Sequence, residues 1–217
     1  MSARPVVVVG AGGHAVSVAE SVQAAGYELV AFTSDRGSGE TLLDRPVLDA
    51  IPQDHLDSGG LVVVAIGDNS AREAAWRALM STVPMDQCPA LIHPSASVSA
   101  LATVGPGTVI LQGAIVGSAA HVGTGCLLNS GSVLDHESTM ADFSSLAPGA
   151  VTGGRVSIGR GSAVCIGAVV RHGLMIGSDT VVGAVSYVNA DVPSGVVAYG
   201  TPARVVRKRQ LGDPYLG

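Results

Sequence analysis

The feature that most constrains this chain is a six-residue repeat that runs from Ile92 to Val188 without a change of register. Sixteen of its seventeen positions are aliphatic, and the exception is Thr152. A period of six is a multiple of the two-residue repeat of a β-strand and does not match the 3.6-residue helical repeat. The repeat therefore predicts very short strands separated by turns.

A second register, four residues after the first, carries mostly Ala, Ser, Thr and Cys, from Ala96 to Ser186. One buried aliphatic residue and one small corner residue in each six-residue unit are typical of a parallel β-helix. Three units would close one triangular turn of about 18 residues, which places residue i about 4.8 Å from residue i+18. We expect this β-helix and a short C-terminal tail to occupy residues 91–217, after an N-terminal domain at 1–90.

Composition agrees with stacked coils, because columns of Val, Ile and Leu leave little room for rings and aromatic residues make up only 3% of the chain. A net charge of −5 argues against a nucleic-acid partner. No apolar run reaches the roughly 18 residues needed to span a bilayer, so a soluble protein is expected. Three cysteines without a CxxC spacing predict reduced thiols and a cytoplasmic location.

The N-terminal domain begins with the pattern of strand, glycine-rich turn, helix and strand. The valine run at 5–9 is typical of a parallel strand covered on both faces. The GAGGHA turn that follows could hold a phosphate against free backbone N–H groups, as half of a dinucleotide fingerprint. A turn needed only for packing is the alternative. The candidate contacts are the backbone of Gly10, Gly12 and Gly13, the side chain of His14, and Asp35 for a ribose hydroxyl.

A second buried strand, at 61–66, ends in Gly-Asp-Asn and precedes an alanine-rich helix from Ser70 to about Ser81. Strand ends are where open α/β sheets bind ligands, so Asp68, Asn69 and Arg72 are further candidates. Asn69 or Ser70 is the expected N-cap of this helix. A solvated cap and a surface arginine are the alternative to ligand contacts. Residues 36–58 predict a loop with a short helix near 49–51. A sheet of this half-Rossmann size suits a mononucleotide better than NAD.

The chemistry of the repeat region is concentrated at Asp135-His136-Glu137. A neutral His136 could accept a proton as a general base, and Glu137, or second Asp135, could orient the ring. The 18-residue spacing places Gly154 one coil above His136, beside the break in the register at Thr152. The Gly154 N–H could face a developing oxyanion. A surface Asp-His-Glu without function is the alternative.

The motifs GAGGHA, AIGDN, LIHPSA, LNSGSVLDHE, TGGRVSIG and YGTPAR occur in this order along the chain. In this the chain resembles the hexapeptide-repeat bacillosamine and perosamine N-acetyltransferases and the sialic acid O-acetyltransferases. The resemblance implies a left-handed β-helix, a homotrimer, and acetyl-CoA as co-substrate in the groove between neighbouring helices. It assigns His136 as general base, Glu137 as its partner and the Gly154 amide to the thioester carbonyl. It also implies that the N-terminal domain binds a nucleotide-linked amino sugar.

The resemblance carries over less completely at the CoA site. Ser145 stands where some relatives have histidine, and Ala184 stands where some have glycine. Arg204, in the basic cluster near the C-terminus, is a candidate for the CoA phosphates, although such a cluster is often a solvated tail. No metal is expected. Ser34 replaces a second acidic residue of some relatives, which leaves UDP and GDP both open as the nucleotide.

The expected reaction is direct attack of a sugar 4-amine on acetyl-CoA with His136 as base, without an acyl-enzyme. O-acetylation of sialic acid or another sugar hydroxyl is the alternative, and a nucleotide-binding trimeric scaffold without catalysis is less favoured. A γ-type carbonic anhydrase would need a third zinc ligand beside His136 and His172, and the sequence offers none at the required spacing. An NAD-dependent oxidoreductase would need a larger sheet.

Overall fold

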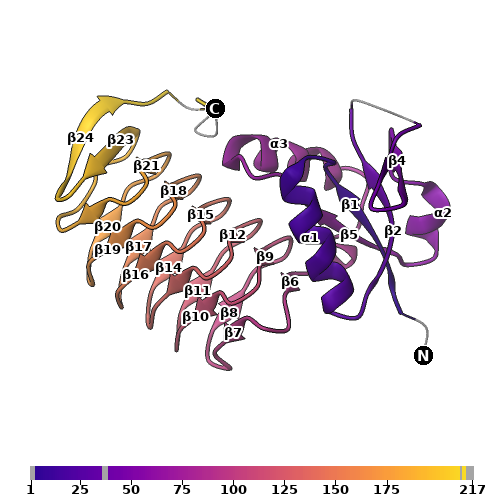
Figure 1. Cartoon of the computed structure of the whole chain (residues 1–217), viewed down its shortest axis with the longest axis horizontal. Coiled ribbons are helices and arrows are strands. Elements are labelled where there is room, and N and C mark those ends of the chain that lie inside the picture. Colours follow the sequence, from indigo (N-terminus) through magenta and orange to yellow (C-terminus); the bar gives the residue numbers. More distant parts are fainter. Residues whose placement is uncertain (1–2, 36–38, 211, 214–217) are drawn as a thin grey trace.

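A five-stranded sheet forms the N-terminal part of the computed structural model, which describes residues 3–35, 39–210 and 212–213 (Figure 1). The strand order is β3-β4-β2-β1-β5, and all neighbours are parallel except the β3–β4 hairpin. The strands are β1 (Pro5–Val9), β2 (Glu28–Thr33), β3 (Thr41–Leu42), β4 (Arg45–Leu48) and β5 (Leu61–Val64). The helices are α1 (Gly13–Ala24), α2 (Gln53–Asp57), α3 (Asn69–Leu79) and the 3-10 helix η1 (Met85–Gln87).

The strand, glycine-rich turn, helix and strand at the start of the chain lie where the sequence predicts them, but two local predictions are wrong. The β3–β4 hairpin was missed because its turn residues Leu43 and Asp44 lack the Asn-Gly signature, although both have positive φ (49° and 56°). The short helix lies at Gln53–Asp57 instead of near residue 50. The N-cap of α3 is Asp68, whereas Asn69 and Ser70, which were expected there, lie inside the helix. The Asp68 carboxylate accepts a hydrogen bond from the Ala71 N–H at 3.0 Å.

The repeat region forms a left-handed prism of stacked coils, as predicted. Residues 18 apart pair in parallel, for example Ile115 with Val133 and Leu127 with Ser145. The aliphatic register fills the interior, and even Thr152 is buried there. The Thr152 Oγ1 accepts a hydrogen bond from the Asp135 N–H at 3.1 Å, so the break in the register fixes the backbone beside His136.

Three sheets form the faces of the prism. We call them the first face (β6, β9, β12, β15, β18, β21, β23, β24), the second face (β7, β10, β13, β16, β19, β22) and the third face (β8, β11, β14, β17, β20). The strands are β6 (Leu91–Ile92), β7 (Ser97–Val98), β8 (Thr103–Val104), β9 (Val109–Ile110), β10 (Ile115–Val116), β11 (His121–Val122), β12 (Leu127–Leu128), β13 (Val133–Leu134), β14 (Thr139–Met140), β15 (Ser145–Leu146), β16 (Val151–Thr152), β17 (Ser157–Ile158), β18 (Ala163–Val164), β19 (Val169–Val170), β20 (Met175–Ile176), β21 (Val181–Val182), β22 (Tyr187–Val188), β23 (Val196–Gly200) and β24 (Ala203–Lys208).

The N-terminal domain packs on the first face of the prism (Figure 1). The outward side chains Leu91, Val109 and Leu127 of that face belong to the same hydrophobic cluster as Ala15 and Val18 of α1. In a triangular prism, the edge opposite the first face is the one between the second and third faces. That edge carries His136, so the domain and His136 of one chain lie on opposite sides of the prism.

Asn69 and Arg72 join the two parts of the chain, which corrects their predicted role in ligand binding. Both side chains are 2% exposed. The Arg72 Nε donates to the Gly125 carbonyl at 2.7 Å, and the Asn69 Nδ2 donates to the Gly161 carbonyl at 3.1 Å. Because buried polar groups must be hydrogen-bonded, these contacts account for both residues without a ligand. No helix within the described residues is long and apolar enough to cross a bilayer.

Candidate active site

His136 lies at the corner between β13 and β14, with its side chain 47% exposed. Its Nδ1 lies 3.1 Å from Oε2 of Glu137, and its backbone N–H donates to the Asp135 carboxylate at 2.7 Å. An ionised carboxylate only accepts hydrogen bonds, so the ring proton belongs on Nδ1. In the neutral ring, Nε2 then carries the free lone pair that a general base requires.

Glu137 adopts a left-handed backbone conformation with φ of 56°. This conformation recurs at every sixth residue from Gly107 to Val185, and eight of these fourteen corner positions are glycine. A side chain in this conformation costs about 1 kcal/mol, and such strain is often kept at functional sites. The conformation alone does not mark a function, because Ala119, Phe143, Arg155, Asp179 and Val185 share it at other corners. What distinguishes Glu137 is the contact of its carboxylate with the His136 ring.

Gly154 lies directly against the imidazole of His136. A Cβ added at residue 154 would come within 2.3 Å of His136 Nε2, so only glycine allows the ring to lie here. Among the described residues, the Gly154 N–H has no hydrogen-bond partner. An unprotonated ring nitrogen and a free peptide N–H are therefore adjacent, which suits proton removal and stabilisation of an oxyanion in one step.

The residues predicted to contact CoA do not lie together within one chain. They are Gly154, Ser145, Ala184 and Arg204. Ser145 points outward from the first face and is only 3% exposed, so its predicted contact with CoA is not available. Ala184 is exposed at the corner between the first and second faces, which is a different edge from that of His136. Arg204 on β24 is exposed beside a cavity of about 430 Å³ that Ala190 also lines. Residue 190 lies three 18-residue steps above residue 136, on the same edge of the prism between the second and third faces. Since Arg204 lines the same cavity as Ala190, it lies near the far end of this His136 edge.

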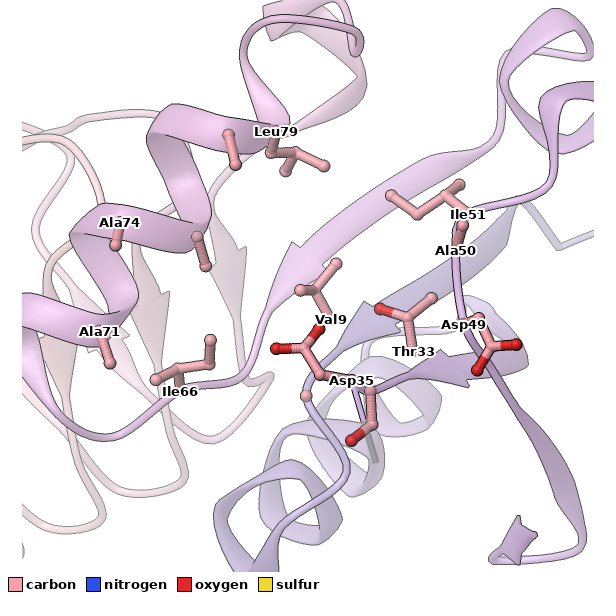
Figure 2. Close-up of a pocket in the computed structure, with 14 residues that line it drawn as sticks. Val9, Thr33, Asp35, Asp49, Ala50, Ile51, Ile66, Ala71, Ala74 and Leu79 are labelled. Carbon is pink, nitrogen blue, oxygen red and sulfur yellow. The ribbon is translucent and has the colours of Figure 1, made fainter. Parts of the chain in front are cut away.

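A cleft opens at the carboxyl ends of β1, β2 and β5, where open α/β sheets bind ligands. It consists of a first cavity of about 660 Å³ and a second cavity of about 610 Å³, which share Gly10, Ser34 and Ile66. Figure 2 shows the first cavity, with the Asp35 carboxylate directed into it and α3 on the opposite side. The combined size suits a nucleotide-linked sugar better than a single small metabolite.

The glycine-rich turn lines the second cavity. Gly10 has φ of 115°, and a Cβ there would approach the Ala65 carbonyl oxygen to 2.8 Å, so the close approach of β1 and β5 requires glycine. Gly12 and Gly13 face open space, and α1 begins without a side-chain cap. The Ala15 N–H donates to the Gly12 carbonyl, but the N–H groups of Gly13 and His14 are open to an anion such as a phosphate.

His14 also lines the second cavity, at the first turn of α1. Burial and the nearby charge of Arg72 lower the pKa of His14 to about 4. The ring is therefore neutral at physiological pH and offers one hydrogen-bond donor and one acceptor. Asp68, which was predicted as a ligand contact, uses one oxygen as the α3 cap, and its other oxygen is buried without a partner among the described residues.

The three described cysteines are weak competitors of His136 as the reactive group. Burial raises the pKa of the Cys126 and Cys165 thiols, and burial together with Asp86 raises the pKa of Cys88 to about 11. A thiol with a raised pKa is a weak nucleophile at neutral pH. Within residues 3–35, 39–210 and 212–213, no three His, Cys, Asp or Glu side chains lie close enough to hold a metal ion.

Comparison with known proteins agrees with this geometry over nearly the whole chain. The family model of the PglD N-terminal domain matches residues 5–79. A variant of GDP-perosamine N-acetyl transferase from Caulobacter crescentus, solved with CoA and GDP-perosamine, superposes with a TM-score of 0.87 at 32% identity, covering 94% of this chain and 97% of that one. The acetyltransferase domain of PglB from Neisseria gonorrhoeae FA1090, in complex with acetyl coenzyme A, gives a TM-score of 0.83 at 32% identity and covers 94% and 100% of the two chains.

One curated relative matches a shorter region. It is galactoside O-acetyltransferase from Lactococcus lactis, 47% identical over 47 residues, which are 22% of this chain. This chain spans 23% of the length of that relative. The match shows a shared segment and leaves the acceptor of this chain open.

Proposed function

This chain belongs to the family of hexapeptide-repeat sugar acetyltransferases, and we propose that it moves the acetyl group of acetyl-CoA to the 4-amine of a nucleotide-linked amino-deoxy sugar. The observation that carries this proposal is that the His136 ring, contacted by Glu137 at Nδ1, lies directly against Gly154, whose N–H has no partner among the described residues. We assign nucleotide-sugar binding to residues 1–90 and acetyl transfer to residues 91–217.

The geometry supports a direct transfer. The His136 Nε2 accepts a proton as the sugar amine attacks the thioester carbonyl, while Glu137 holds Nδ1 and favours the imidazolium that forms. The oxyanion of the tetrahedral intermediate accepts a hydrogen bond from the Gly154 N–H. The C–S bond then breaks, the CoA thiolate leaves, and the proton on Nε2 passes to the sulfur. The acetyl group thus ends on nitrogen without becoming bound to the protein.

We propose that each active site lies between two copies of the chain in a homotrimer. The cleft belongs to the domain on the first face, whereas His136 lies on the opposite edge of the same prism. A second copy is therefore needed to present its sugar to His136. The outward-pointing side chains of the second face are apolar in every coil after the first, whereas those of the third face are mostly polar. The second face therefore suits the contact between two copies. It contains Ile115, Val133, Val151, Val169 and Tyr187, against Thr103, His121, Thr139, Ser157 and Met175 on the third face.

Replacing Val169 by glutamate should convert the trimer to monomers and remove most of the acetyl transfer, because a charge would be buried at the apolar contact. Sedimentation velocity and a thiol-release assay measure the two effects. Met175→Glu is the matched control, since Met175 is 56% exposed on the third face against 42% for Val169 on the second. A monomeric wild type with full activity would contradict the shared site, and so would dissociation by Met175→Glu alone.

The reaction itself is tested by incubating the protein with acetyl-CoA and a panel of 4-amino nucleotide sugars, with sialic acid in parallel, while free thiol is followed. We expect thiol release with an amino sugar linked to a nucleotide and none with sialic acid. Release with sialic acid alone would support O-acetylation, the activity for which the Lactococcus relative is named. If none of the acceptors gave thiol release, the hypothesis of a nucleotide-binding scaffold without catalysis would remain.

We also propose that acetyl-CoA lies along the His136 edge, with its phosphates toward Arg204. The same assay tests this through Arg204→Gln, which should raise KM for acetyl-CoA and leave KM for the sugar unchanged. The described cysteines Cys88, Cys126 and Cys165 are free thiols. Because free thiols persist in reducing compartments, we propose that the enzyme works in the cytoplasm.

A further inference from the structure

The first cavity has an unusual wall, which is the face of α3 that looks toward the ends of β1 and β2 (Figure 2). Ala71, Ala74, Ala75 and Ala78 recur with the spacing of one helix face. A helix that packs on a sheet usually fills such a face with large apolar side chains. Here the alanines leave open space between α3 and the strand ends, bounded also by Val9 and Ile66, and this space is part of the first cavity.

The charges around the first cavity define which part of a nucleotide it can hold. Asp35 and Asp49 line it, and none of its described lining residues is Lys, Arg or His. The carboxylates of Asp35 and Asp49 would repel phosphates, whereas the second cavity presents the N-terminal turn of α1 to them. The diphosphate therefore belongs in the second cavity. The base, which is neutral and planar, belongs in the first.

The hydrogen-bonding capacity of the Asp35 carboxylate distinguishes among the four bases. An ionised carboxylate accepts hydrogen bonds and donates none, and it pairs best with two parallel donors. Guanine presents N1–H and N2–H₂ side by side on one edge. Uracil presents a single N3–H between two carbonyl oxygens, which the carboxylate would repel, and adenine and cytosine place a ring-nitrogen acceptor beside their amino group. Only guanine offers Asp35 two adjacent donors.

We propose that the first cavity binds guanine, with Asp35 accepting hydrogen bonds from N1–H and N2–H₂, so that the acceptor sugar is carried on GDP. This inference rests on the proposed function, since it names the nucleotide of the same substrate. It also changes the role that the sequence suggested for Asp35, from the ribose hydroxyl to the base. Asp49 lies at the rim in Figure 2, where it does not share this contact.

Calorimetric titration of the full-length protein with GDP, IDP, UDP and ADP tests the proposal without requiring turnover. A hydrogen bond to a charged group contributes about 1.5–3 kcal/mol, which corresponds to about 10- to 150-fold in affinity. GDP should therefore bind at least about 10-fold more tightly than UDP or ADP. IDP lacks the 2-amino group and should lose about 10-fold relative to GDP. Equal or tighter binding of UDP would overturn the proposal.

Two variants of the same cavity make the test specific. Asp35→Asn should bring GDP down to the affinity of UDP, whereas Asp49→Asn should leave the ratio of GDP to UDP unchanged. An equal loss for every nucleotide in Asp35→Asn would mean that Asp35 holds the ribose, and the proposal would fail. GDP preference without any acetyl transfer would refute the proposed function alone. Acetyl transfer to a UDP-linked sugar by a protein that does not prefer GDP would refute this inference alone.

Discussion

Replacing His136 by alanine should lower kcat for acetyl transfer by about 10²- to 10⁴-fold, which is the usual contribution of a general base. The KM values for the sugar nucleotide and for acetyl-CoA should change little, because the ring acts in proton transfer and does not line the nucleotide cleft. The measurement is steady-state thiol release over a range of both substrates. Calorimetry with the nucleotide should show that binding is retained.

His172→Ala is the matched control for this prediction. His172 lies on the same prism edge, two coils above His136, and among the described residues it has no side-chain hydrogen bond. Its removal should therefore leave kcat within about 2-fold of the wild type, and any effect should fall on KM for acetyl-CoA, because His172 lies along the edge proposed for acetyl-CoA. A His136→Ala variant with kcat close to wild type would contradict the proposed mechanism, whatever the behaviour of the control.

The prism could be predicted from the sequence because its repeat is strictly local. Each six-residue unit determines one short strand and one corner, and the 18-residue step then places Gly154 above His136 without any knowledge of distant contacts. The register break at Thr152 did indicate a feature of the site, since the Thr152 hydroxyl accepts a hydrogen bond from the Asp135 N–H beside His136. A third register of positive-φ corners was overlooked. Glu137 is one of six non-glycine residues at these fourteen corners, so the register alone would not have singled it out without the neighbouring His136.

The contacts between the two parts of the chain could not be predicted in this way. Arg72 and Asn69 follow a strand end, which is the usual place for ligand contacts, but they donate to carbonyls of coils more than 50 residues later in the chain. Ser145 occupies an outward strand position, and its burial depends on what covers the first face. Such roles depend on how separately folded surfaces meet. A local sequence pattern does not predict which residues will lie at that interface.

The alanine face of α3 shows a related limit. From the sequence, an alanine-rich helix indicates high helix propensity and nothing more. The face becomes informative once the structure sets it against the ends of β1 and β2, where small side chains leave open space instead of a core (Figure 2). The second cavity differs, because the glycine-rich turn that lines it is readable from its motif alone. The proposed phosphate site could therefore be predicted from the sequence, and the proposed base site could not.

Replacing Gly154 by alanine should lower kcat by about 10²-fold or more, although the substitution adds a single methyl group. The new Cβ would meet the His136 ring within 2.3 Å of Nε2, so the ring must turn away from the position where it accepts the proton. The methyl group would also crowd the approach to the residue 154 N–H, and loss of one oxyanion donor alone costs about 10²- to 10³-fold. Steady-state kinetics and a crystal structure of the variant would measure the two effects.

Gly173→Ala separates this local effect from a general loss of stability. Gly173 lies on the coil above Gly154 with φ of 71° and open space where a Cβ would stand. Alanine there costs about 1 kcal/mol of backbone strain, which lowers the melting temperature by about 2–4 °C without touching His136. We expect Gly173→Ala to melt earlier than Gly154→Ala and yet to retain its kcat. If both variants lost activity in proportion to their stability, the contact between His136 and Gly154 would be a packing contact and the site would need another oxyanion donor.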